Sequence, residues 1–352
     1  SANKFCGAMR YFDAQFDDTR LLVNILETAV GAGALILNYA EVIALNKNNH
    51  GQIRAITFRD RESDKTFEIA TRSVVNATGA ASDELLKLDE PSHKQTILPS
   101  RGAHIVVKRH FLATQDALLM PRTPDGRIMF AIPWLDHLLI GTTDTPCDGK
   151  QRNPVPTEVE IEMILEVAGN YFERAPGHDD ILSSFAGIRP LVLVPSTSKT
   201  SKVSREHRID VLKSGLISVS GGKWTTYRTM AEQCVDTLAS SHNWSIPESP
   251  TASLKMHATP DTRVHPQRFS EYGIHASKLE QLISDDPTMN DLLSKDLPYT
   301  KVHCVWAIRH EMARTVEDIL ARRTRALFLN KMAATEAAPK VLEILHQELG
   351  LD

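Results

Sequence analysis

The stretch that decides the fold is residues 215–228, which read GLISVSGGKWTTYR. It begins with an apolar, β-branched run that predicts a buried strand. Two glycines, Gly221 and Gly222, then allow the backbone to turn sharply and to approach another group closely. Two threonines can cap a helix over residues 229–239, which have apolar side chains at helical spacing. A strand, a Gly-Gly turn and a helix N-terminus form a binding site for an electron-rich group, because N–H groups and the helix dipole point toward it.

Lys223 adds a positive charge at the same point. The spacing alone is also typical of an ordinary strand-to-helix turn with a solvated lysine. The string Gly-Gly-Lys-x-Thr-Thr-Tyr-Arg, however, resembles the flavin-binding segment of the FAD-dependent glycerol-3-phosphate dehydrogenases, which are D-amino-acid-oxidase-like flavoproteins. The resemblance implies that this helix N-terminus faces the pyrimidine edge of the flavin, where reduced flavin carries negative charge. It assigns FAD contacts to Gly221, Gly222, Lys223, Trp224 and Thr225.

The composition is that of an ordinary globular protein. The 352 residues are 42% hydrophobic and 24% charged, which leaves room for two or three domains. A net charge of −4 gives no electrostatic footprint for nucleic acid. The four cysteines lie far apart with no CxxC pair, so we expect no metal site and no disulfide framework, but reduced thiols. The sequence contains no signal peptide and no apolar run of transmembrane length, so we expect any membrane contact to be peripheral.

The first helix is predicted after Asp17 and Asp18. An apolar periodic run that extends to Val30 comes after these two residues, and aspartate is a good helix cap. General acid–base catalysis is the alternative interpretation of the acidic pair. The string at 10–22, RYFDAQFDDTRLL, also resembles the glycerol-3-phosphate dehydrogenases, in which it leads a helix.

Residues 34–45, 53–58 and 67–76 are expected to form strands, and Asn-Asn-His-Gly between the first two predicts a hairpin turn. The third strand ends on Val-Val-Asn-Ala-Thr-Gly. The resemblance implies that Thr78 and Gly79 form a loop beside FAD, where the glycine allows close approach of the backbone. Ala-Ala follows where the family usually has Pro-Trp.

Residues 97–147 are predicted to form consecutive antiparallel strands, because strand-like segments alternate with turns. The strings Gly-Ala-His-Ile-Val-Val, Ile-Pro-Trp and Ile-Gly-Thr-Thr-Asp resemble the family in order and spacing. A lone histidine on a strand, here His104, is more often structural than functional. The resemblance implies instead that His104 lies beside the flavin, contacts the substrate and takes the proton of its C2 hydroxyl.

Arg189 is expected between a strand and Pro190, which would end that strand. A guanidinium on such a fixed backbone suits a phosphate monoester, to which it can donate paired hydrogen bonds. The alternative is a structural arginine that binds a carbonyl oxygen. The string Ala-Gly-Ile-Arg-Pro-Leu resembles the family's Gly-x-Arg-Pro-Leu, which implies that Arg189 holds the substrate phosphate.

Helices are predicted in two other regions. Residues 157–172 form an amphipathic pattern, and residues 302–320 have apolar side chains at helical spacing after a proline-containing linker that begins near 243. The cluster Arg322, Arg323 and Arg325 could favour an anionic membrane surface, or else lie on a solvated face or at a helix C-terminus. The apolar face of the helix predicted over residues 157–172 is expected to comprise Val159, Ile161, Ile164, Leu165 and Ala168.

The expected fold class mixes α/β and α+β elements. Residues 4–90 are predicted to be part of a FAD-binding domain, 91–188 an antiparallel substrate-binding domain, 189–242 a return to the FAD-binding domain, and 243–352 a C-terminal helical domain. The family's Gly-x-Gly-x-x-Gly segment, which binds the ADP half of FAD, has no counterpart in the sequence. We therefore expect the C-terminal part of a longer enzyme, inactive by itself and binding FAD weakly or not at all.

For the intact enzyme, the resemblance implies oxidation of sn-glycerol 3-phosphate to dihydroxyacetone phosphate, with FAD as cofactor and a quinone as electron acceptor. His104, with an ordinary histidine pKa of about 6.5, would act as base, and Lys223 would stabilise reduced flavin. Two alternatives stay open: a glycerol-3-phosphate oxidase that uses oxygen, and a non-enzymatic glycerol-phosphate-binding or assembly module. The expected location is the cytoplasm, with peripheral contact on the inner face of the cell membrane and a homodimer left open.

Overall fold

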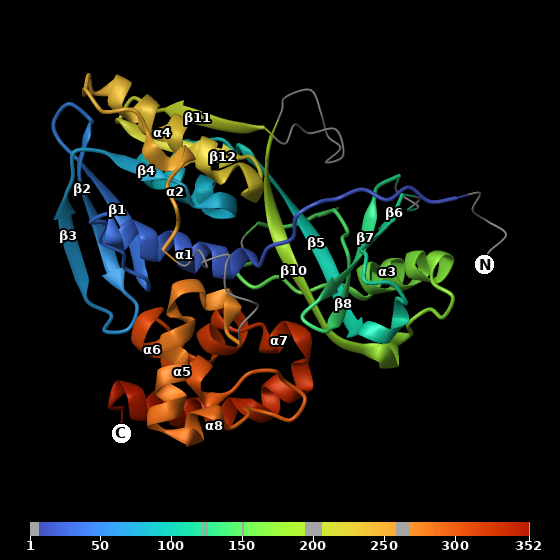
Figure 1. The fold of residues 1–352 in the computed structure, drawn as a ribbon. Coiled ribbons are helices and arrows are strands. Elements are labelled where there is room, and N and C mark those ends of the chain that lie inside the picture. The colour runs from blue at the N-terminus through green and yellow to red at the C-terminus, as the bar shows by residue number, and fades with distance from the viewer. Residues whose placement is uncertain are drawn as a thin grey trace.

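The computed structural model describes residues 7–121, 123, 126–149, 151–193, 206–257 and 268–351. In this part of the chain, three β-sheets lie beside a group of C-terminal helices, and α1 (Asp18–Gly31) runs between the sheets and those helices (Figure 1). The predicted mixture of sheets and a helical C-terminal region is confirmed. Cys6, one of the four cysteines, and Pro260 of the proline-containing linker lie outside the described residues.

The first sheet is antiparallel, in the order β1-β2-β3. The hairpin predicted between its first two strands is confirmed, but the strand predicted from residue 34 begins only at Ala40. Tyr39, with a φ of 55°, interrupts the extended backbone just before it. The predicted strand 67–76 is in fact two strands, because the Thr71 hydroxyl bonds the Ser73 carbonyl and turns the chain. The strands are β1 (Ala40–Lys47), β2 (Ile53–Asp60), β3 (Thr66–Ala70) and, in another sheet, β4 (Val74–Asn76).

The second sheet contains the strand predicted from residue 215 onward, and the predicted turn and helix follow that strand. β12 (Leu216–Gly221) pairs with β11 (His207–Val211) and, in parallel, with β4. Its first residues are fully buried, and a turn leads from it into α4 (Tyr227–Ser241), so the predicted strand, turn and helix are confirmed. The predicted side-chain cap is wrong: neither helical start after the turn has one, and the Thr226 hydroxyl bonds the Lys223 carbonyl at 3.0 Å. α2 (Ser82–Asp89) packs against this sheet.

The third sheet is the predicted antiparallel sheet, in the order β10-β5-β8-β7-β6 with β9 beside β5. α3 (Glu158–Tyr171) covers it and contributes Ile164 and Ala168 to a common core. Val159, predicted on the apolar face of that helix, is instead 79% exposed, because it lies in the first turn on the outer side. The strands are β5 (Ile97–Lys108), β6 (Leu118–Met120), β7 (Met129–Trp134), β8 (His137–Gly141), β9 (Thr145–Pro146) and β10 (Ile181–Val192).

Pro190 does not end its strand as predicted. β10 continues through Pro190, which lies opposite Pro99 of β5, to Val192. β10 is the outermost strand on its side of the sheet, so a residue without an N–H removes no ladder bond from a second neighbour. The predicted domain boundary at 188/189 falls inside this strand, and the division into domains stays a prediction.

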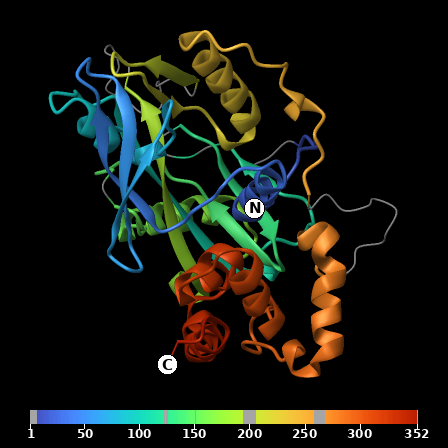
Figure 2. The same cartoon turned by 90° about the vertical axis from the view of Figure 1, so that its left-hand side faces the viewer.

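The C-terminal helices form a separate hydrophobic core, and two views show them gathered at one end of the molecule (Figures 1 and 2). The helical pattern predicted over 302–320 is broken after His310, because Met312 has a φ of 55°. The chain becomes helical again in a π-helical segment, Asp318–Arg323. The α-helices are α5 (Ala276–Asp285), α6 (Lys301–His310), α7 (Ala326–Leu329) and α8 (Lys331–Leu349).

None of the helices among the described residues is both long and apolar enough to span a membrane. Cys147, Cys234 and Cys304 form no disulfide in this part of the chain, and the described residues contain no cluster of potential metal ligands.

Candidate active site

A cavity of about 890 Å³ lies where β5, β10, the Gly-Gly turn and the C-terminal helices meet. Most of the predicted site residues line it, although they are spread over more than 100 positions of the sequence. They are His104, Arg189, Gly221, Gly222, Lys223 and Trp224. Thr78, Gly79 and Thr225, predicted to contact FAD, are not among the described lining residues.

His104 is held between two neighbouring strands. On one side its ring stacks on Phe185 of β10, with ring centroids 5.2 Å apart. On the other side lies Gly141 of β8, where an added Cβ would be 2.3 Å from the His104 Cδ2 atom. Glycine is therefore required at position 141 for the imidazole to occupy this place. This requirement was not predicted from the sequence, although Gly141 lies in one of the strings that resemble the family.

The environment lowers the pKa of His104 to about 4. Burial is the main cause, because it disfavours the charged imidazolium, and the positive charge of Arg189 adds to the effect while Asp18 opposes it. The predicted ordinary pKa is therefore wrong, and the imidazole is neutral near pH 7. Its Nδ1 atom is buried and has no hydrogen-bond partner among the described residues.

Arg189 projects its guanidinium over the backbone of β5. Its Nη1 donates to the Thr143 carbonyl at 3.0 Å, and its Nη2 donates to the Thr142 hydroxyl at 2.9 Å. An added Cβ at Gly102 would lie 2.4 Å from Nη2, so only glycine leaves room for this arrangement. Arg189 thus binds a carbonyl, in agreement with the structural interpretation, and also lines the cavity.

Both glycines of the turn are required by their backbone and by their neighbours. Gly221 and Gly222 have φ angles of 72° and 78°, in the left-handed region. An added Cβ would lie 2.7 Å from the Glu206 carbonyl oxygen at position 221, and 2.5 Å from the Met230 sulfur at position 222. Lys223 beside them is exposed.

Several residues of the cavity wall were not predicted from the sequence, because their partners are remote along the chain. Arg325 donates to the two carboxylate oxygens of Asp17, at 2.7 and 2.9 Å, and also bonds Asp18. Asp17 does cap α1 as predicted, by accepting from the Arg20 amide at 2.8 Å. Asp17 therefore caps α1 and binds Arg325, and Asp18 binds the same arginine. Among the other wall residues that the sequence did not place at the site are Phe185, Arg322 and Phe328.

Arg322 and Arg323 lie in the last turn of the helical segment Asp318–Arg323, so the alternative of a helix C-terminus is confirmed for these two arginines. Arg322 donates to Glu317 at 2.7 Å, and Arg323 donates to the Glu311 carbonyl at 2.7 Å. These two guanidiniums bind oxygens within the C-terminal region, whereas Arg325 reaches Asp17 and Asp18 at the start of α1.

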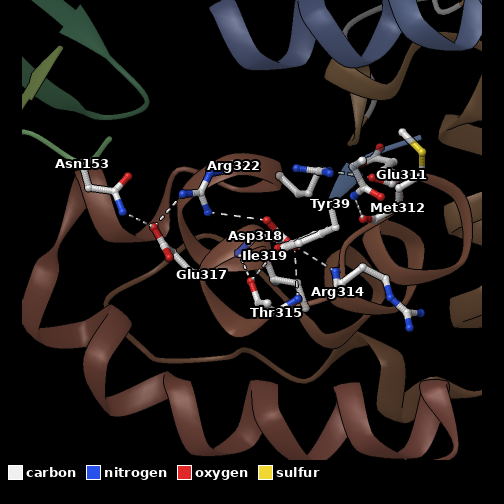
Figure 3. Close-up of polar contacts among 12 residues, drawn as sticks. Tyr39, Asn153, Glu311, Met312, Arg314, Thr315, Glu317, Asp318, Ile319 and Arg322 are labelled. Atoms are coloured by element: carbon white, nitrogen blue, oxygen red, sulfur yellow. Dashed lines mark hydrogen bonds and ion pairs between the residues drawn. The ribbon is translucent and has the colours of Figure 1, made fainter. Parts of the chain in front are cut away.

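Asp318 organises the wall around Arg322 (Figure 3). It accepts from the Tyr39 hydroxyl at 2.6 Å and from the amides of Arg314 and Thr315 at 2.9 and 3.1 Å. Burial alone would raise the pKa of the Asp318 carboxyl, but these hydrogen bonds and nearby arginines lower it. A charged carboxylate therefore joins the segment before β1 to the C-terminal helices.

The residues at the Gly-Gly turn fit a bound flavin. The Trp224 Nε1 atom is buried and has no partner among the described residues, so a donor is available to an acceptor that is not part of the protein. Gly221 and Gly222 both line the cavity, and the exposed Lys223 supplies a positive charge beside them.

Comparisons with known proteins identify what this site resembles. A family model described as FAD dependent oxidoreductase matches residues 1–228, and one described as the C-terminal domain of alpha-glycerophosphate oxidase matches residues 217–352. The human protein named glycerol-3-phosphate dehydrogenase, mitochondrial, is 33% identical over 377 residues, which cover 99% of this chain and 52% of the relative. The Schizosaccharomyces pombe protein of the same name is 32% identical over 97% of this chain and 62% of its own length. The chain thus spans about half the length of the human relative.

A solved structure, the glycerol-3-phosphate dehydrogenase from Bacillus halodurans complexed with FAD, superposes with a TM-score of 0.82. It is 28% identical in sequence, and the match covers 96% of this chain and 70% of that one. The resemblance stated from the sequence motifs is therefore confirmed by both sequence and structure.

Proposed function

Because the chain belongs to the FAD-dependent oxidoreductase family, we propose that the protein oxidises sn-glycerol 3-phosphate to dihydroxyacetone phosphate with FAD as cofactor. The names of its relatives support this substrate. The observation that carries the proposal is that one cavity is lined by a neutral imidazole, a phosphate-binding type of guanidinium and a lysine.

Each of the three side chains has a distinct role in this proposal. Arg189 binds the phosphate, because its planar fork is held in place by Thr142 and Thr143 and carries a permanent charge. His104 accepts the proton of the C2 hydroxyl, since it is unprotonated near pH 7. Its low pKa makes it a weak base, so correct placement against the hydroxyl matters more for His104 than basicity.

FAD would be held by Gly221, Gly222, Lys223 and Trp224. When bound, FAD supplies the two-electron acceptor for substrate oxidation. Lys223 places a positive charge beside the cofactor, and Trp224 offers an indole N–H. Contacts from Thr78, Gly79 and Thr225 stay predictions.

The final electron acceptor is proposed to be a quinone. The relatives are named dehydrogenases, which supports an acceptor other than oxygen. Quinones dissolve in membranes, so the proposal includes a cytoplasmic protein with peripheral contact on the inner face of the cell membrane. A homodimer is a separate part of the proposal. Parallel assays of the full-length protein, one with a soluble quinone and one for hydrogen peroxide under oxygen, separate a dehydrogenase from an oxidase.

Replacing His104 by alanine in the full-length protein tests the central role. Turnover is expected to fall by a factor of about 10²–10⁴, the usual contribution of a general base, while the FAD content per mole of protein stays near that of the parent. His110→Ala is the matched control, because this histidine lies just after β5, is exposed and is not among the residues that line the cavity. Unchanged turnover in the His104 variant would contradict the proposal.

A titration of this chain with FAD tests the prediction that it binds the cofactor weakly or not at all. Flavin fluorescence is expected to stay unquenched at micromolar FAD. Tight binding would show that the described residues are sufficient to hold the cofactor.

A further inference from the structure

We propose that Phe328 and Arg325, on the C-terminal helices, are positioning residues for His104, because they hold in place the Phe185 ring on which the imidazole rests. The effect on catalysis rests on the proton-accepting role proposed above, but the placement of the imidazole does not.

The orientation of the His104 ring is set by packing. Its Nδ1 atom has no hydrogen-bond partner in the described part of the protein, so no polar contact at that atom fixes the ring. Phe185 supplies the aromatic surface on which it stacks, with the two rings 16° from parallel. Whatever fixes Phe185 therefore fixes the imidazole.

Phe185 is itself held from the C-terminal side. The Phe328 ring packs edge-on against it, with centroids 4.6 Å apart and an interplanar angle of 76°. This is a favourable aromatic geometry. The Ser183 hydroxyl donates to the Leu327 carbonyl at 2.9 Å, which ties α7 to the same face of β10 two residues away.

Arg325 connects this stack of aromatic rings to the start of α1. Its guanidinium carbon lies 5.4 Å from the centre of the Phe328 ring, within cation–π range. The same guanidinium is fixed by the bidentate pair with Asp17, at the start of α1. A column of contacts thus runs from Asp17 through Arg325, Phe328 and Phe185 to His104, and all five residues line the cavity.

Loss of the Phe328 ring would leave a void beside Phe185 and admit water. Interiors are close-packed, so a neighbour of such a void gains freedom and solvent contact. Burial is the main cause of the low pKa of His104, and partial hydration of the imidazole would raise that pKa. The charged groups that face the imidazole are Arg189 from β10 and Asp18 from α1, and the substitution replaces neither of them.

The test is an NMR titration of the His104 ring protons in this chain, without cofactor or substrate, with the signal assigned from a His104→Gln variant. We expect Phe328→Leu to raise the pKa of His104 by about one unit or more toward the ordinary 6.5. Phe328→Tyr, which keeps the ring, should leave it near 4. The matched control is Phe58→Leu, which breaks another aromatic pair, Phe58 with Phe67, in the β1-β2-β3 sheet and should also leave it near 4.

An unchanged titration in a folded Phe328→Leu protein overturns the proposal, as does an equal shift in the Phe58 control. If Phe328→Leu fails to fold, Phe328→Met, which fills more of the same volume, carries the same expectation. In the full-length protein, Phe328→Leu should lower kcat several-fold with little change in KM. Because the titration needs no activity, it separates failure of the positioning role from failure of the proposed reaction.

Discussion

At the scale of single residues, glycines decide where the functional side chains lie. Gly102 leaves room for the Arg189 guanidinium, and Gly141 leaves room for the His104 ring. Neither glycine has a φ in the left-handed region, so both are required for space and not for backbone conformation. Such a requirement depends on the neighbouring strand and has no local signature in the sequence.

Replacing Gly102 by alanine is expected to displace the Arg189 guanidinium, since the new Cβ would lie 2.4 Å from its Nη2. The affinity of the full-length protein for glycerol 3-phosphate should fall by about 10–100-fold, the value of a charged hydrogen bond. Gly187→Ala is the matched control, because nothing lies within 4 Å of an added Cβ there although Gly187 also lines the cavity. Calorimetric titration with substrate measures both, and equal affinities would refute the steric argument.

At the scale of elements, α1 is held against the C-terminal helices by charge. Arg20 donates to Glu311, whose side chain is only 1% exposed, and also to the Arg323 carbonyl at 2.9 Å. Burial alone would lower the pKa of Arg20, but the Glu311 carboxylate raises it. Breaking a buried pair from one side leaves an uncompensated charge, which costs more than the pair contributes.

Arg20→Met should therefore reduce the free energy of unfolding by about 3–5 kcal/mol. The double variant Arg20→Met, Glu311→Leu should recover much of this loss, because no buried charge is left alone. Urea unfolding followed by circular dichroism gives the free energy of unfolding of the parent, the single variant and the double variant. A double variant at least as unstable as the single one would show that the Glu311 charge is not the source of the cost.

The start of α1 provides a second test at this scale. Asp17 caps the helix and holds Arg325, whereas the Asp18 side chain is 66% exposed. Asp17→Ala is expected to cost about 2 kcal/mol, from the cap and the ion pair together, and Asp18→Ala less than about 1 kcal/mol. Thermal unfolding of the two variants compares them directly, and equal losses would contradict the assignment.

How far the sequence predicts this molecule depends on the range of the interaction. The strand, turn and helix around Gly221 and the cap at Asp17 were predicted, because local residue preferences determine them. The partnership of Asp17 with Arg325 could not be predicted, since the two residues are 308 positions apart. Pro190 was misjudged because its tolerance depends on an edge position in the sheet, which the sequence does not state.

At the scale of the whole molecule, two histidines make stability depend on pH, the partly buried His104 and the buried His303. Burial lowers the pKa of His104 to about 4 and that of His303, among the C-terminal helices, to about 3. In the unfolded chain both would titrate near 6.5. The unfolded state therefore binds more protons below pH 6.5, so protons favour unfolding as the pH falls.

We expect the free energy of unfolding to fall by roughly 2 kcal/mol for each of these two histidines between pH 7 and pH 5. His303→Gln should remove its share of this dependence, while His110→Gln, at an exposed position, should leave the dependence unchanged. Urea unfolding at both pH values measures the slope. A His303 variant with the parent's slope would show that the imidazole is not buried neutral in the folded protein.

The long-range pair that closes the cavity has a consequence for biosynthesis. Asp17 leaves the ribosome long before Arg325, 308 residues later, so the cavity wall cannot be completed until Arg325 has emerged. Until then the α1 start and the Phe185 face of β10 lack their C-terminal partners, and domains usually fold as their sequence emerges. The cavity is therefore completed only after α7 has emerged, and a nascent chain stalled before α7 exposes an incomplete site to chaperones.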